Sequence, residues 1–299
     1  MGSRTPSLLC LGNLTIDEAL QPDGTRTIEP GGDALYAALA ARTHLDAVRW
    51  LAPIGADFPQ NVLDHLAATG LVCAEPARRE SPTVRNVVTY LDDGSRTWEL
   101  VHGDAHFEAM SVSPDDLTSP MLAADGILIS AMSPRSQLRL TPWIRQNSTA
   151  TIFLDVQEDD LEGNEDAWRS IIPCCDVFLP SEVEATTLSG TSDLARALRM
   201  FGELGPRIVA IKLAERGCLV LDVNSGTSAE IAVERVEPVD STGAGDAFCG
   251  AFAAATLLGA DAERAARAAC DSARIAIGAA GIQGLLDVTP ARRAEVTVG

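Results

Sequence analysis

The sequence is poor in aromatic residues, in lysine and in positive charge. Aromatic residues make up 4% of its 299 residues, Lys212 is the only lysine, and the formal net charge is −19. Domains that bind nucleic acid or anionic membranes are usually basic, so we expect neither partner. Few aromatics together with abundant alanine favour closely packed helices over an all-β sandwich.

Disulfide, zinc and membrane signals are also missing. The seven cysteines are odd in number and none forms a C-x-x-C pair, which argues against a disulfide framework or a thiolate zinc site. The longest apolar run, 247–260, is too short to cross a bilayer. No basic stretch followed by an apolar one opens the chain. We therefore expect a cytoplasmic protein with reduced thiols.

Several common catalytic motifs do not occur. The sequence has no GxxxxGK[ST], no GxSxG and no HExxH, and no GxGxxG follows its first predicted strand. The four histidines show no spacing typical of metal ligands. These absences exclude P-loop, Rossmann, serine-hydrolase and zinc-protease sites of the usual kind.

Short apolar runs alternate with stretches of helical spacing. This alternation predicts an α/β fold with a mostly parallel sheet covered on both faces. The predicted strands are 7–11, 48–52, 126–130, 151–155, 176–179, 207–212 and 218–221. The predicted helices are 34–42, 60–69, 135–146, 182–189, 193–204, 245–258 and 262–277.

Two segments look too polar for the centre of such a sheet. Segment 83–100 alternates with period two around Asp92-Asp93-Gly94, and segment 16–28 turns near Pro22-Asp23-Gly24. Both patterns are typical of β-hairpins. They predict a small accessory sheet outside the core.

The run Thr242-Gly243-Ala244-Gly245-Asp246 precedes an apolar helix. A helix start offers unpaired N–H groups and partial positive charge, and glycines let a ligand approach the backbone. These features predict an anion-binding turn. An acid beside it would be a suitable base for a hydroxyl that attacks a phosphoryl group.

Residues 240–248 closely resemble D-[TS]-x-G-A-G-D-x-F, the C-terminal signature of the ribokinase-like carbohydrate kinases, the PfkB family. Gly12-Asn13 with Asp17, Gly31-Gly32-Asp33, and segments 54–57 and 181–184 resemble other motifs of that family in the same order. The resemblance implies a single domain over 1–299, with a mostly parallel sheet flanked by helices and a small β-sheet lid. The core would be about 7–13, 32–82 and 101–299, and the lid about 14–31 and 83–100. A homodimer through the lid is a further expectation.

The resemblance also implies roles for individual residues. The catalytic set is Asp246 as general base, with Gly243, Ala244 and Gly245 as the anion hole. The substrate-binding set is Asp17, Gly31, Gly32, Asp33, Tyr36 and Trp98. The nucleotide-binding set is Lys212, Thr242, Gly217 and Cys270. Glu184 and Ser181 would organise Mg²⁺ through water, and the cofactors would be ATP and Mg²⁺.

Four positions depart from the family pattern, one of them Gln157, since Asp155-Val156-Gln157 stands where the family commonly has D-x-N. Tyr36, Ser181 and Cys270 each stand where the family commonly has asparagine. Tyrosine is larger than asparagine and has one hydroxyl, so we expect an acceptor pocket different from that of a ribokinase. Ser181 weakens the metal assignment without removing it, because Glu184 keeps the carboxylate.

The sequence therefore predicts an ATP-dependent kinase for an alcohol group of a small sugar or polyol. Two alternatives stay open: a nucleoside kinase of the same family, and a sugar- or nucleotide-binding regulator without turnover. Asp246 with both glycines argues against the regulator, because a binder needs no base. For three residues, a purely structural role also stays open as an alternative to the functional one. In that case Asp17 caps a turn, Lys212 is a solvated lysine at a strand end, and Trp98 packs within the lid.

Overall fold

A computed structural model describes residues 4–73, 77–91 and 96–288. Within strands β6, β8 and β9 (bounds below), the side chains of Val72, Tyr90, Arg96 and Trp98 also lie outside the description. Within these ranges, no helix is both long and apolar enough to span a lipid bilayer.

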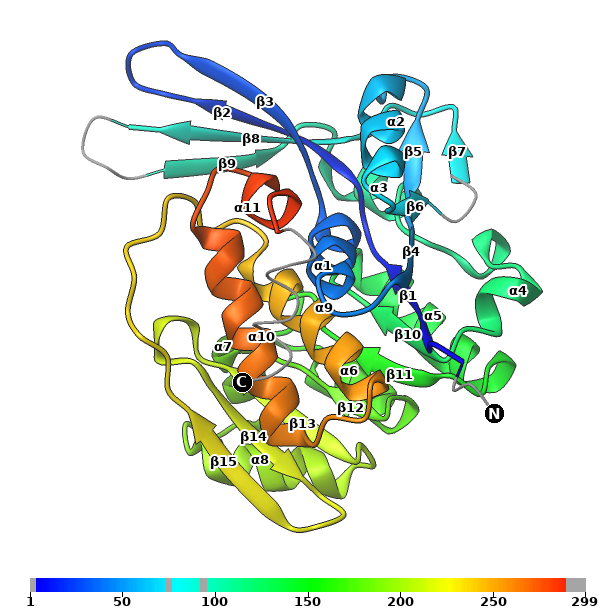
Figure 1. The fold of residues 1–299 in the computed structure, drawn as a ribbon, viewed down its shortest axis with the longest axis vertical. Helices are drawn as coiled ribbons and strands as arrows, with labels where there is room; N and C mark the ends of the chain where they lie inside the picture. The colour runs from blue at the N-terminus through cyan, green and yellow to red at the C-terminus, as the bar shows by residue number, and fades with distance from the viewer. Residues whose placement is uncertain (1–3, 74–76, 92–95, 289–299) are drawn as a thin grey trace.

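A nine-stranded sheet forms the centre of the described chain, in the order β15-β14-β13-β12-β11-β10-β1-β4-β6 (Figure 1). Its parallel strands are β1 (Ser7–Leu11), β4 (Ala47–Leu51), β6 (Val72–Cys73), β10 (Gly126–Ile129), β11 (Thr151–Leu154), β12 (Val177–Phe178) and β13 (Ile208–Lys212). Strands β14 (Cys218–Asp222) and β15 (Thr227–Ile231) extend it antiparallel. The parallel strands are apolar because helices cover both of their faces.

Alternate residues of β1 enter two separate cores. Leu8 and Cys10 pack on one face of the sheet, and Leu9 and Leu11 on the other. The first face, in front in Figure 1, carries α1 (Asp33–Arg42), α9 (Ala244–Leu257) and α10 (Ala262–Ile277). The opposite face carries α5 (Pro134–Asn147), α6 (Glu165–Ile171), α7 (Glu182–Ser189) and α8 (Leu194–Glu203). Shorter or peripheral helices are α2 (Gln60–Ala68), α3 (Gly103–Ala109), α4 (Ser119–Leu122) and α11 (Gln283–Leu286).

A separate four-stranded sheet, in the order β3-β2-β8-β9, extends to one side of the core (Figure 1). Its strands are β2 (Thr15–Leu20), β3 (Arg26–Gly31), β8 (Val84–Tyr90) and β9 (Arg96–Leu100). Two short strands, β5 (Pro53–Gly55) and β7 (Ala77–Arg79), pair elsewhere. The predicted accessory sheet is thus confirmed, although its Asp92-Asp93-Gly94 turn lies outside the described residues.

Helices α1 and α9 approach closely because their contact face carries almost no side chain. A Cβ on Gly250 would lie 1.9 Å from the carbonyl oxygen of Ala37. Alanines around this contact, among them Ala251 and Ala254, are fully buried. This packing brings the first turns of α1 and α9 together, which matters for the site described next.

Most predicted elements are confirmed to within about two residues, and two helices, α7 and α10, have the predicted bounds. The sequence analysis missed β6, β15, α3, α4, α6, α11 and the β5–β7 pair. Strand β15 reads TSAEI and is mostly exposed, so it carries no apolar run. Strands β5 and β7 have three residues each, which is too short to show a period.

Candidate active site

The first turn of α9 has the geometry that the glycine-rich run predicts. Gly243 is its N-cap, with φ 72°, a left-handed conformation that glycine adopts without strain. A Cβ at this position would lie 2.2 Å from ring atoms of Tyr36. Glycine is therefore required here both by backbone conformation and by the tyrosine ring. Asp246 follows within the first helical turn and is partly buried.

Asp246 is poised to hold a proton near neutral pH. Burial and the nearby Asp155 carboxylate raise the pKa of Asp246 to about 7, and Lys212 acts in the opposite direction. Asp155 comes directly after β11 and is 4% exposed. An acid with this pKa can accept a proton from a hydroxyl and release it again.

Lys212 ends β13 beneath this helix turn. Its Nζ forms an ion pair with Asp155 and lies 3.6 Å from the Cys249 sulfur, one turn along α9 from Asp246. Burial acts to lower the pKa of Lys212, but Asp155 and the other neighbouring anionic groups raise it overall. The only lysine of the chain is thus a charged, mostly buried group, and not a solvated strand end.

Glu184 lies in the first turn of α7, where Ser181 is the N-cap. The Ser181 N–H donates to Glu184 Oε2 at 2.7 Å, and the Glu184 N–H donates to Ser181 Oγ at 3.2 Å, which forms a capping box. Burial raises the pKa of Glu184 to about 7, opposed by Lys212. A buried carboxylate with a raised pKa is ready to accept a cation or a metal-bound water.

Among the described residues, no group of three or more His, Cys, Asp or Glu side chains could hold a metal ion alone. Asp155 nonetheless acts on both Glu184 and Asp246, and Lys212 opposes the rise in pKa of each. Such a site fits Mg²⁺, which keeps several waters and is commonly bound by few carboxylates together with substrate phosphates.

The residues predicted to bind substrate meet where β2, β3 and α1 come together. A Cβ on Gly31 would lie 1.9 Å from Asp17 Oδ2, so only glycine leaves room for this carboxylate. The Asn86 side-chain N–H donates to Asp17 Oδ1 at 2.9 Å. Gly32 has φ 104°, and a Cβ there would lie 2.4 Å from the Asn13 carbonyl oxygen.

Asp33 begins α1 and faces the same region as Asp246. Burial raises the pKa of Asp33 well above its usual range, and Asp246, Asp155 and Asp17 add to the effect. Tyr36 follows on α1, is 2% exposed and packs its ring on Gly243. The tyrosine therefore occupies the space between the two helix starts.

Trp98 belongs to β9, where its backbone pairs with Val88 of β8. Its side chain lies outside the described residues.

On the other side of α9 lies a cavity of about 450 Å³. Lys212, Gly217, Gly245 and Cys270 line it, together with apolar side chains of α10 and of segment 233–238. Its lining includes Ser241 but not Thr242, whose N–H donates to Asp240 Oδ1 at 2.9 Å. Three of the four residues predicted to bind nucleotide thus share one cavity, next to the first turn of α9.

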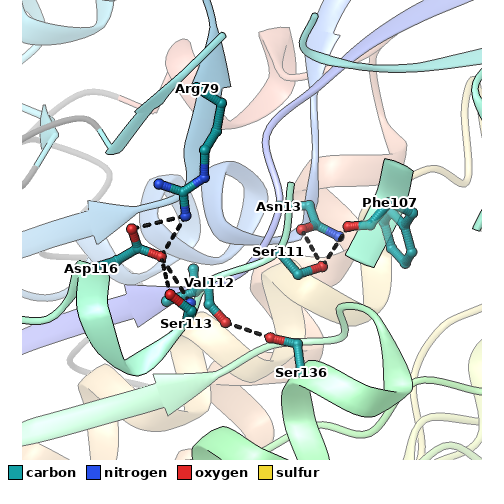
Figure 2. Close-up of polar contacts among 8 residues, drawn as sticks. All are labelled: Asn13, Arg79, Phe107, Ser111, Val112, Ser113, Asp116 and Ser136. Atoms are coloured by element: carbon teal, nitrogen blue, oxygen red, sulfur yellow. Dashed lines mark hydrogen bonds and ion pairs between the residues drawn. The ribbon is translucent and has the colours of Figure 1, made fainter. Parts of the chain in front are cut away.

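A polar network ties segment 111–116 to the end of β1 (Figure 2). The Ser111 hydroxyl donates to Asn13 Oδ1 at 3.3 Å and to the Phe107 carbonyl at 2.9 Å. Arg79 donates to both oxygens of Asp116, at 2.9 and 2.7 Å. The network binds the Asn13 side chain, and the backbone carbonyl of Asn13 lies beside Gly32.

The sequence analysis missed Asp155, Cys249 and Asn86 as members of the site. Asp155 carried a usable signal, because ligands of open α/β sheets bind at the carboxyl ends of parallel strands. Asn86 and Cys249 carried none, because only the pairing of β2 with β8 and the turn of α9 bring them to Asp17 and Lys212.

Kinases are among the proteins that are similar to this chain. The chain is 28% identical over 267 residues to a cytidine kinase of Thermococcus kodakarensis, covering 89% of this chain and 94% of that protein. It is 24% identical over 260 residues to a 2-dehydro-3-deoxygluconokinase of Escherichia coli, covering 79% and 84%. The fold matches that of Arabidopsis thaliana ribokinase, complexed with ribose and ATP, with a TM-score of 0.79, 21% identity and coverage of 99% and 100%.

The sequence pattern of the pfkB family of carbohydrate kinases matches residues 7–288, which is nearly the whole chain. Together with the ribokinase-like fold, this match shows that the chain belongs to the pfkB carbohydrate kinase family.

Proposed function

We propose that this protein is an ATP-dependent phosphotransferase that phosphorylates an alcohol group of a small sugar or polyol. The observation that carries the proposal is the position of Asp246. It lies at the start of α9, between a cavity lined by Gly245 and Lys212 and the carboxylates Asp17 and Asp33. Its pKa of about 7 suits a general base.

In this proposal the acceptor hydroxyl loses its proton to Asp246. The backbone N–H groups of Gly243, Ala244 and Gly245 would stabilise the charge of the transferring phosphoryl group. Asp17 and Asp33, with Gly31 and Gly32 leaving room beside them, would accept hydrogen bonds from the other hydroxyls of the substrate. Catalysis would consist mostly of positioning and electrostatics.

The nucleotide would occupy the 450 Å³ cavity, with Gly217 and Cys270 beside the base and Thr242 and Lys212 toward the phosphates. Mg²⁺ supplies positive charge to the phosphates when bound, and Glu184 with Ser181 would orient its water ligands. Because Lys212 is paired with Asp155, we propose that it acts by holding this carboxylate in place beneath the anion hole.

A nucleoside is the second candidate acceptor. The match to the cytidine kinase extends over most of both chains, which favours a nucleoside as the acceptor. A panel of sugars, polyols and nucleosides with Mg-ATP, read by ADP release, tests both candidates. If no member of the panel stimulates ADP release while sugars and ATP still bind, the protein is the regulator without turnover.

We further propose that the four-stranded sheet is a lid that closes over the acceptor and excludes water. In this proposal the lid comprises about 14–31 and 83–100, and the core comprises about 7–13, 32–82 and 101–299. Stacking of Trp98 on the substrate and a homodimer formed through the lid stay predictions.

Replacing Glu184 by glutamine should raise the Mg²⁺ concentration needed for half-maximal activity. The amide keeps the shape of the side chain and loses the charge that attracts the metal-bound water. Glu182 on the same helix, with a side chain 42% exposed and paired with Arg216, provides the matched control Glu182→Gln. Mg²⁺ titrations of both variants test the role, and full activity in excess EDTA would exclude it.

Activity should fall as the pH is lowered through about 7. Burial raises the pKa values of Asp246 and Glu184, so both groups gain protons as the pH falls, and a protonated base cannot act. We expect kcat/KM to approach a roughly tenfold decrease per pH unit for each group that must be ionised. Saturating Mg²⁺ should remove the Glu184 contribution. A flat profile between about pH 5 and about pH 9 would contradict this prediction.

A further inference from the structure

Four elements contribute carboxylates to the acceptor side of the proposed site. Asp17 and Glu29 lie directly opposite each other on β2 and β3, so their side chains share one face of the small sheet. Asp33 lies in the first turn of α1 and Asp246 in that of α9. Glu29 was not predicted from the sequence to belong to the site.

Tyr36 marks the centre of this group. Burial has the largest effect on the pKa of Tyr36 and raises it. The charges of Asp240, Asp17, Asp246 and Glu29 raise it further. Glu29 also approaches the loop before α11, since a Cβ on Gly281 would lie 2.0 Å from Glu29 Oε2. The carboxylates therefore surround the tyrosine, and Glu29 lies where the small sheet meets the C-terminal helices.

No ion pair of the described chain involves Asp17, Glu29, Asp33 or Asp246. The arginines nearest to Asp17 along the small sheet, Arg26 and Arg85, bind Glu18 at 2.6 and 3.5 Å. Glu18 is adjacent to Asp17 in β2, so its side chain points to the opposite face. Lys212 is held by Asp155. Within the described residues, no arginine or lysine therefore forms an ion pair with these four carboxyl groups.

The side chains of Asp17, Glu29, Asp33 and Asp246 present carboxyl oxygens, which accept hydrogen bonds when ionised. Asn86 uses its side-chain N–H on Asp17, which fixes its Oδ1 as an acceptor, and this buried oxygen has no partner. Carboxylates and amide oxygens bind hydroxyl or amine donors. They offer nothing to a carboxylate or phosphate of a substrate.

We propose that the acceptor site takes an uncharged polyol or nucleoside and rejects sugar acids and sugar phosphates, with Glu29 as a residue that determines this selectivity. The inference rests on the proposed kinase function and narrows its substrate class. Like charges brought together in a site shielded from water repel strongly, and no arginine or lysine of the described chain compensates them here. We therefore expect the acceptor to be uncharged, like the nucleoside in the name of the cytidine kinase relative. We do not expect a sugar acid like the one in the name of the 2-dehydro-3-deoxygluconokinase.

Matched acceptors that differ in charge test this proposal. With Mg-ATP, kcat/KM is measured for glucose against glucuronate and for uridine against orotidine, and for 2-dehydro-3-deoxygluconate. We expect each acid to have a kcat/KM lower than that of the neutral acceptors by about 100-fold or more, the size of a like-charge penalty. An acid phosphorylated as well as its neutral partner would overturn the proposal. ADP release with none of the acceptors would overturn the kinase function itself, and this inference with it.

Two variants locate the determinant. Glu29→Gln removes a charge beside Asp17 and should raise the acid-to-neutral ratio of kcat/KM by about tenfold. Glu99→Gln removes a charge from the same sheet at an exposed position of β9 and should leave the ratio unchanged. Equal ratios in the two variants would overturn the role of Glu29.

Discussion

Replacing Asp246 by asparagine should lower kcat by about 10²- to 10⁴-fold, the usual range for loss of a general base. The asparagine keeps the size of the side chain and the start of α9, so the anion hole formed by Gly243–Gly245 stays intact. ATP affinity should therefore stay within a few-fold of the wild type. Steady-state kinetics with a neutral acceptor, together with calorimetry for ATP, separates the two quantities.

Asp271→Asn serves as the matched control for Asp246→Asn. Asp271 lies on α10 and is exposed, so the same chemical change there should leave kcat unaltered. Turnover of Asp246→Asn close to that of Asp271→Asn would show that another group accepts the proton.

Replacing Lys212 by methionine should destabilise the protein by about 3–5 kcal/mol. The side chains of Lys212 and Asp155 are only 12% and 6% exposed, so the substitution leaves a buried carboxylate without its partner. Breaking a buried ion pair in this way has a cost of about that size. Urea unfolding of the two proteins, read by circular dichroism, measures the difference in free energy of unfolding.

The Lys212 prediction has two controls. Arg267→Met breaks the surface pair with Glu263, whose side chains are 55% and 52% exposed, and should cost at most about 1 kcal/mol. The double variant Lys212→Met, Asp155→Asn removes both charges of the pair and should recover most of the lost stability. A double variant no more stable than Lys212→Met would show that packing of the lysine stem, and not its charge, is responsible.

Local patterns sufficed for the elements that bury a continuous apolar face. Strands such as β1 and β10 consist almost wholly of buried aliphatic residues, and α7 is bounded by a capping serine and a C-terminal glycine, so their positions can be predicted from neighbouring residues alone. Strand β15 could not be predicted because it is a mostly exposed edge strand without an apolar run, and β5 and β7 could not because three residues are too few to show a period.

By itself, the sequence determined the alternation of the parallel core, the two polar hairpins and the glycine-rich start of α9 with its acid, since each is a property of adjacent residues. Only the tertiary structure decided the electrostatics of the site. The pairing of β2 with β3 brings Glu29 to Asp17, and the α1–α9 contact at Gly250 brings Asp33 toward Asp246. The parallel strands β11 and β13, on either side of β12, bring Asp155 to Lys212. The physical reason is that charges act through space, over distances that depend on how the elements pack and not on their separation along the chain.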